Sequence, residues 1–185
     1  MSTRAPRNDF DEFVRRQQVS STVAEIDWEK ERDEWLDYLN LLYKRVEAFL
    51  TTYTSSGQIV LEYRNVKLNE ENIGSYIARK MVLRIGRQEV SLVPVGTLLI
   101  GCKGRVDIVG PAGKARVLLV DSDASGLAAL VHVSVGTGGK IPVFAEPASR
   151  TIKWAWRIVT RPPERRFVEI TQERLFDLIM EVANG

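Results

Sequence analysis

The stretch WEKERDEWLDYLNLLYKRVEAFLTTYTSSGQIVLEYR, residues 28–64, contains two different spacings of apolar side chains. In its first part the apolar residues lie alternately four and three positions apart, at Trp35, Leu39, Leu42, Val46, Phe49 and Tyr53. Because neither Pro nor Gly interrupts the series before Gly57, this spacing predicts a long helix. After Gly57, Ile59, Leu61 and Tyr63 alternate with Val60, Glu62 and Arg64, which predicts a strand.

The apolar stripe of this predicted helix is broader than the seam of a two-stranded coiled coil. Leu36, Tyr43 and Leu50 each follow a stripe residue and widen the face, whereas Leu41 lies off it. So broad a face is typical of a helix that covers a domain core. The first half is acidic, with Glu25, Asp27, Glu29, Glu31, Asp33, Glu34 and Asp37. Negative charge there suits the positive end of the helix dipole, and an acidic docking face is the functional alternative.

Short alternating segments with Gly and Pro between them fill the middle of the chain. Ile77, Met81, Leu83 and Ile85 would line one face of a second strand, with Arg79 as the exception. Gly86-Arg87 has the composition of a two-residue hairpin of type II′. Further strands are expected at residues 89–93, 97–100, 105–109, 114–120, 127–135 and 151–160. This pattern predicts an antiparallel meander that closes as a sandwich or a barrel.

The chain closes on a short helix that is apolar around most of its circumference. Thr171 can cap it, and Glu173, Asp177 and Glu181 form its one polar stripe. Such a helix is buried on several sides or meets a partner. The predicted fold class is therefore α+β, with a predominantly antiparallel sheet between a long N-terminal and a short C-terminal helix. The predicted division is a polar arm over residues 1–22 and a single domain over 23–185, comprising a helix at 23–56, a β-rich core at 58–160 and a helix at 171–183.

Composition excludes several classes of protein. The 185 residues are 44% hydrophobic and 27% charged, as in globular proteins. The net charge of +2 gives no general attraction to nucleic acid or anionic membranes. A lone cysteine, Cys102, excludes an internal disulfide and a zinc site with two cysteines. With no apolar run near the N-terminus, we expect a cytoplasmic protein that does not bind membranes.

Two segments resemble ligand-binding loops without matching them. Gly136 to Lys140 is glycine-rich, but Ser134 and Ile141 stand where a phosphate-binding P-loop needs Gly and Ser or Thr. Residues 121–126, DSDASG, resemble the first half of an EF-hand calcium loop, yet the twelfth position is His132 instead of Glu. Asp and Ser are also ordinary turn residues. We expect no cofactor and no metal, although the sequence leaves open whether Asp121, Asp123 and Ser125 bind one.

The most basic segment surrounds two tryptophans. Its cations are the candidate partner-binding or anion-binding residues Lys153, Arg157, Arg161, Arg165 and Arg166. Stacking aromatics beside cations hold single-stranded nucleic acid. In a strand, however, Trp154 and Trp156 share a face with Ile152 and Ile158, so they should point to the core. Pro162-Pro163 should present the last three arginines outward.

Three functions are consistent with these features. The first is a non-enzymatic protein-interaction or assembly subunit that uses its apolar terminal helices to bind a protein partner or a second copy. The alternative is a binding module for an anionic ligand or nucleic acid through residues 153–166. An enzyme with chemistry at Asp121, Asp123 and His132, or at a Cys102–His132 dyad, ranks last because no catalytic pattern surrounds these residues. No catalytic residue is therefore predicted.

Overall fold

A computed structural model describes residues 27–97, 102–124, 152–161 and 165–184. Several predictions fall outside these ranges: the arm at 1–22, the strand at 127–135 and the glycine-rich loop at 136–140. His132 and Ser125 also lie outside them, as does Pro162-Pro163.

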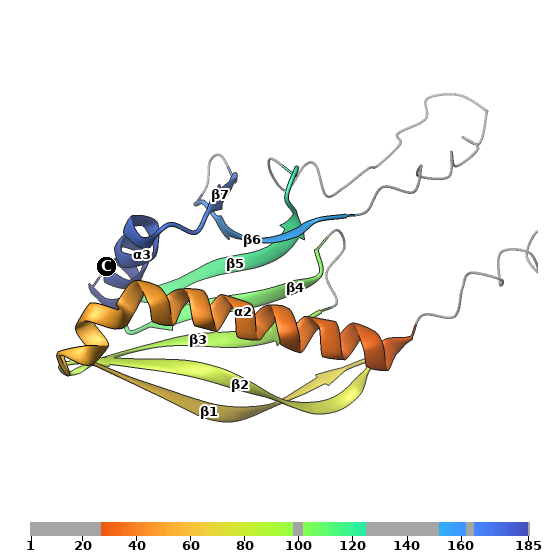
Figure 1. Cartoon of the computed structure of the whole chain (residues 1–185), viewed down its shortest axis with the longest axis horizontal. Coiled ribbons are helices and arrows are strands. Elements are labelled where there is room, and N and C mark those ends of the chain that lie inside the picture. Colours follow the sequence, from red (N-terminus) through yellow and green to blue (C-terminus); the bar gives the residue numbers. More distant parts are fainter. Residues whose placement is uncertain (1–26, 98–101, 125–151, 162–164, 185) are drawn as a thin grey trace, which may run out of the picture.

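The described chain is a helix, a seven-stranded sheet and a second helix (Figure 1). The elements are α2 (Trp28–Ser55), β1 (Ile59–Glu70), β2 (Gly74–Ile85), β3 (Gln88–Gly96), β4 (Gly104–Gly110), β5 (Gly113–Asp121), β6 (Trp154–Val159), β7 (Phe167–Glu169) and α3 (Gln172–Asn184). Each strand pairs antiparallel with the next, in the order β1-β2-β3-β4-β5-β6-β7. The predicted α+β meander is confirmed, but the sheet is open. Closure is unnecessary because two helices, instead of a second sheet, bury its apolar face.

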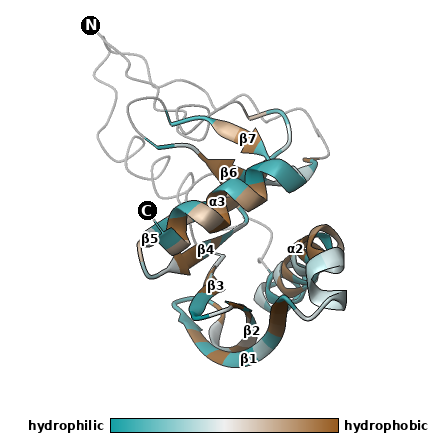
Figure 2. Cartoon of the chain, turned by 90° about the vertical axis from the view of Figure 1, so that its left-hand side faces the viewer, coloured by the Kyte–Doolittle hydropathy of each residue, from teal (hydrophilic) through white to brown (hydrophobic). Residues whose placement is uncertain are grey.

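Both helices lie on the same side of the sheet, and the core lies between (Figure 2). The predicted stripe of α2 supplies its buried residues Trp35, Leu39, Leu42, Tyr43, Val46 and Leu50. From the other end of the chain, α3 buries Leu175, Leu178, Ile179, Val182 and Ala183. Leu41, off the stripe, is 57% exposed. The broad apolar faces of both helices thus cover the chain's own sheet.

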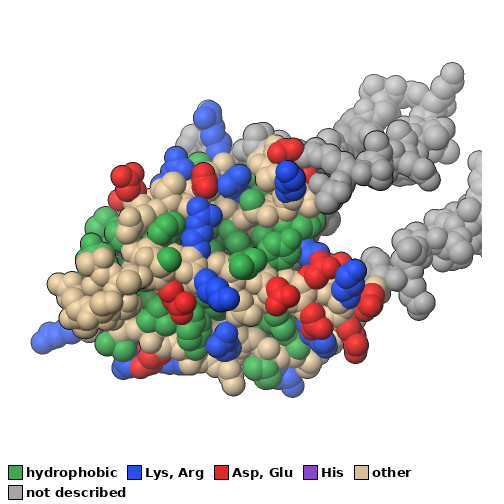
Figure 3. Space-filling view, viewed as in Figure 1, with side chains coloured by type: hydrophobic (Ala, Val, Ile, Leu, Met, Phe, Trp, Pro, Cys, Tyr) green, Lys and Arg blue, Asp and Glu red, His purple; other side chains and the backbone are tan. Residues whose placement is uncertain are grey.

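Local signals fix where the elements begin and end. The Asp27 carboxylate accepts from the Lys30 amide at 3.0 Å, and acidic side chains gather around this end of α2 (Figure 3). Gly57, just past the helix, has φ 73°. Gly86 has φ 59° and no described non-glycine residue has positive φ, which agrees with the predicted type II′ hairpin. Thr171 Oγ1 accepts from the Arg174 amide at 3.3 Å, as expected of a cap.

The single apolar face predicted for the second strand is wrong at its start. Met81 and Leu83 are buried, but Ile77 is 57% exposed while its neighbours Tyr76 and Ala78 are buried. The reason is that β3 pairs with β2 only from Met81 onward, which leaves the first part of β2 in a two-stranded ribbon with β1. Two-stranded ribbons twist more than wide sheets, so the side that faces the core changes along the strand.

Candidate anion-binding pocket

A pocket opens where β5 and β6 separate at one end of the sheet. Their pairing ends at Arg116 and Val159, whereas β5 continues back to Gly113. Beyond Val159 the chain turns toward β7. The Thr160 amide donates to the Arg166 carbonyl at 3.0 Å, and the Arg166 amide donates to Thr160 Oγ1 at 2.8 Å. The gap beside the start of β5, bordered by α3, is here named the fork pocket.

Three kinds of side chain line the fork pocket, whose volume is about 530 Å³. Among the described residues, six are cationic: Arg105, Lys114, Arg116, Arg161, Arg165 and Arg174. Three of the described residues are acidic: Asp107, Asp177 and Glu181. The apolar residues are Ala115, Ile158, Val159, Val168 and Leu178, with Thr160 beside them. The volume lies within the range of pockets that hold small molecules, and the described cations outnumber the described carboxylates two to one.

Two of the cations are neutralised inside the pocket. Arg105 donates to both oxygens of Asp107, with Nε–Oδ1 and Nη2–Oδ2 each 2.7 Å. Asp107 is only 8% exposed, and this bidentate pair raises the pKa of Arg105 above its usual value. Arg161, at the end of β6, forms an ion pair with Glu181 of α3. These pairs link β4 internally and connect the β6–β7 turn to α3, so they shape the pocket.

The remaining cations are available to a ligand. Within the described part of the chain, Lys114, Arg116 and Arg165 form no ion pair. Arg174 donates through Nη1 to the Glu169 carbonyl at 3.1 Å, which orients its guanidinium but leaves its charge uncompensated. Asp177 is the one lining carboxylate without an ion pair in the described ranges. The pocket therefore keeps a positive excess, which favours an anion.

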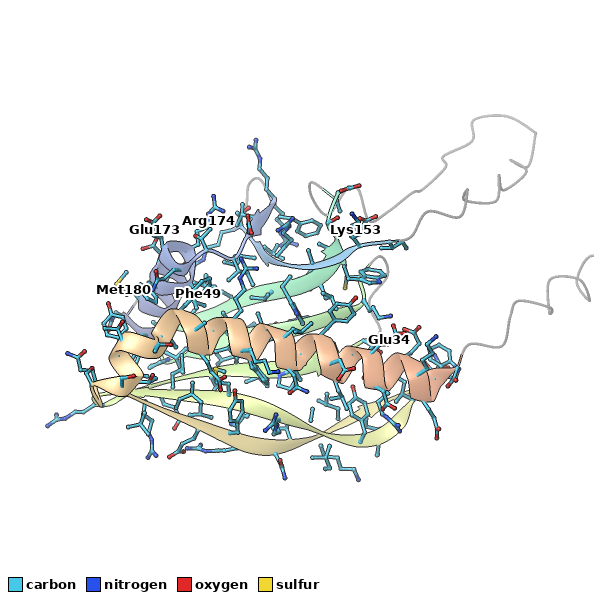
Figure 4. The ribbon with its side chains drawn as sticks, in the orientation of Figure 1. Glu34, Phe49, Lys153, Glu173, Arg174 and Met180 are labelled. Atoms are coloured by element: carbon cyan, nitrogen blue, oxygen red, sulfur yellow. The ribbon has the colours of Figure 1, made fainter. Side chains whose placement is uncertain are left out.

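The five candidate residues from the basic segment do not form one patch. Arg161 and Arg165 line the fork pocket. Lys153 lies at the opposite end of β6 from Arg174 and α3 (Figure 4). Arg157 points to the sheet face opposite the helices and donates to the Ser122 carbonyl at 3.4 Å, and Arg166 is exposed beside the pocket. The twist and length of the strand separate residues that are close in sequence.

Four lining cations were missed in the sequence because they belong to distant elements. Arg105 lies in β4, Lys114 and Arg116 in β5, and Arg174 in α3. One signal was present: Lys114 and Arg116 alternate with Ala115 and Val117, which puts the two cations on one face of a strand. The contribution of β4 and α3 depends on the register of the strands and on where α3 packs, and the sequence predicted neither.

The two tryptophans behave as strand alternation predicts. Trp156 is 7% exposed, stacks at a tilt against Trp35 with centroids 5.9 Å apart, and donates through Nε1 to the Tyr38 carbonyl at 2.9 Å. Trp154 is half-buried against the same core. Ile152, predicted to join them, is 48% exposed because it precedes the first residue of β6. Neither indole is a free stacking platform.

A second, smaller hollow lies between the helix ends. Its volume is about 230 Å³, and its lining includes Tyr53, Ile85, Phe176 and Met180. Tyr53 and Phe176 meet edge-on with centroids 5.6 Å apart. Met180 is 55% exposed, and it projects from α3 near the C-terminal end of α2 (Figure 4). This hollow, here named the apolar groove, is an exposed apolar surface to which both helices contribute.

The described part of the calcium-loop segment is a turn. The Asp121 carboxylate accepts from the Asp123 amide at 3.1 Å, and its carbonyl accepts from the Ala124 amide at 2.9 Å. Within the described ranges, no three metal-ligating side chains gather at one point. Cys102 is buried against Leu118 and Val120, and burial raises the pKa of its thiol.

Comparisons with protein-family models, with curated proteins and with solved structures each found no match to this chain. Neither α2 nor α3, the helices of the described ranges, is long and apolar enough to cross a membrane.

Proposed function

We propose that the protein is a binding module for a small anionic ligand, held in the fork pocket. The observation that carries the proposal is the group of pocket cations that form no ion pair in the described ranges: Lys114, Arg116, Arg165 and Arg174. Four cations at one bounded site repel each other unless an anion joins them. Of the five binding residues predicted from the sequence, only Arg161 and Arg165 line this pocket. The other cations in its lining come from β4, β5 and α3.

A small ligand fits this site better than a nucleic acid strand. Single-stranded nucleic acid is held by a groove with exposed aromatic rings, but none of the described residues that line the fork pocket is aromatic. Trp156 is buried in the core, and the net charge of the whole chain is only +2. A bounded pocket of about 530 Å³ is within the size range of small-molecule sites.

Inorganic pyrophosphate is a suitable probe, because it presents several anionic oxygens within a small volume. We expect isothermal titration to show one binding site at low salt, with the affinity falling as salt is added. Arg116→Gln and Arg165→Gln should each weaken binding about tenfold, the usual effect of losing a charge-assisted hydrogen bond. Lys153→Gln removes the same charge at the opposite end of β6 and should leave binding unchanged. Equal losses in all three variants would contradict the proposal.

A second candidate function is protein interaction or assembly through the terminal helices. The observation that favours it is the apolar groove, where Met180 is 55% and Tyr53 is 39% exposed. It ranks second because most apolar residues of α2 and α3 already cover the chain's own sheet. If the groove is an interface, Met180→Lys should abolish self-association measured by light scattering. Leu41 of α2 is about as exposed as Met180 but lies outside the groove, so Leu41→Lys should not change self-association.

A further inference from the structure

We infer that the fork pocket selects an amphipathic anion, a soluble phosphate monoester with a short apolar organic part. This inference rests on the proposed function and deepens it, because it concerns the part of the ligand that the cations do not hold. The observation behind it is that Lys114 and Arg116 lie on one side of the open edge of β5 and an apolar surface lies on the other, where α3 adds Arg174, Asp177 and Glu181 at the border.

The apolar side comes from residues that face the helices. Ala115 and Val168 pack against the main core and are half-buried, while Ile158 and Leu178 are 6% and 8% exposed. Ile158 and Val168 are cross-strand partners, so they present one continuous surface. Leu178 of α3 faces the same space. These side chains form no hydrogen bonds with water, so an apolar part of a ligand displaces the water beside them favourably.

The cationic side comes from the alternate positions of the same strand. Lys114 and Arg116 flank Ala115 and therefore point to the opposite side of β5. The edge of β5 from Gly113 to Ala115 has no β6 partner, so both sides border one space. A ligand beside this edge contacts cations with one end and apolar side chains with the other. Several unpaired cations favour the two negative charges of a phosphate over the single charge of a carboxylate.

Inorganic anions would use only half of this pocket. Each methylene buried against the apolar side should strengthen binding roughly three- to fourfold, the factor that corresponds to about 0.8 kcal/mol. A volume of about 530 Å³ leaves room for a chain of several carbons. Chain length is therefore the variable that separates this inference from simple anion binding.

The test is a titration series with inorganic phosphate, butyl, hexyl and octyl phosphate, each below its micelle concentration, with 1-octanol as the neutral control. We expect affinity to rise with chain length and octanol to bind at least about tenfold more weakly than octyl phosphate. Val168→Thr, which keeps the shape of the side chain, should reduce the gain from octyl and leave inorganic phosphate unaffected. Met180→Gln in the apolar groove serves as the matched control and should change neither.

The outcomes separate the two levels of the proposal. Phosphates that all bind equally, whatever their chain, would overturn the amphipathic ligand and leave anion binding standing. Binding of octyl phosphate that Arg116→Gln does not weaken, or octanol binding as tightly as octyl phosphate, would overturn anion binding itself. A gain lost in Met180→Gln but kept in Val168→Thr would place the chain in the apolar groove and overturn the inference. Binding to phosphatidic acid vesicles in place of monomeric octyl phosphate would do the same.

Discussion

Replacing Gly110 by alanine tests how α3 is held against the sheet. A Cβ at Gly110 would lie 2.3 Å from the Val182 carbonyl oxygen and 2.7 Å from its carbon, which are backbone atoms of α3. Because ordinary contact begins at 3.4 Å, the end of α3 must withdraw by about 1.1 Å. That carbonyl accepts the Ala112 amide at 2.9 Å, and the Val182 side chain is fully buried.

The expected cost follows from these contacts. Overpacking costs roughly 1–3 kcal/mol, and losing the Ala112 hydrogen bond costs about 0.5–1.5 kcal/mol. The lower backbone entropy of alanine in the unfolded chain returns about 0.4–1 kcal/mol. Gly110→Ala should therefore lower the free energy of unfolding by about 2 kcal/mol, within a range of roughly 0.5–4 kcal/mol, measured by urea denaturation.

Gly113 is the matched control, because it pairs with Gly110 across the same turn. No described atom lies within 4 Å of its Cβ position, and its φ is not positive. Gly113→Ala should stay within about 0.5 kcal/mol of the wild type. Equal losses in the two variants, or no loss at Gly110, would refute the packing of α3 on this turn. Since α3 forms one wall of the fork pocket, Gly110→Ala should also weaken pyrophosphate binding.

Three further predictions concern single side chains. Because burial raises the pKa of Cys102, Ellman's reagent at about pH 8 should modify it at least about tenfold more slowly in the folded protein than in urea; equal rates would contradict its burial. Tyr43→Phe removes the hydroxyl that donates to the Arg79 carbonyl at 2.6 Å, so the free energy of unfolding should fall by about 1 kcal/mol; an unchanged urea midpoint would show that this bond contributes nothing. The Lys103 ammonium, 2.6 Å from Glu34, lowers the pKa of that carboxyl. A carboxyl whose pKa is lower in the folded than in the unfolded protein stabilises the fold at pH values above its unfolded-state pKa. That stabilisation is lost as the pH falls through the folded-state pKa. The difference between wild type and Lys103→Met should therefore be larger at about pH 7 than at about pH 2.5, and a constant difference would contradict the ion pair.

The sequence predicted elements whose signals are local. The helix at α2 follows from its apolar spacing, and the type II′ turn at Gly86 follows from composition. The burial of Trp156 follows from alternation along β6. These properties depend on neighbours within one element, which is why a single sequence contains them.

The features that the sequence predicted wrongly or not at all depend on contacts between distant parts of the chain. Ile77 faces outward because β3 pairs with β2 only from Met81 onward, which leaves the first part of β2 in a two-stranded ribbon with β1. The three-residue strand β7 is too short for an alternating pattern and was missed. The fork pocket combines Arg105, Arg116 and Arg174 from three elements, so only the order of the strands and the position of α3 reveal it.

The most direct test of the central claim is a map of amide chemical shifts during a pyrophosphate titration. The largest changes should fall on residues 114–116, 159–161 and 174–181, which border the fork pocket. Amides near Lys153 and near Met180 should not move. Changes centred on either of those two places, or spread evenly over exposed lysines and arginines, would contradict anion binding in the fork pocket.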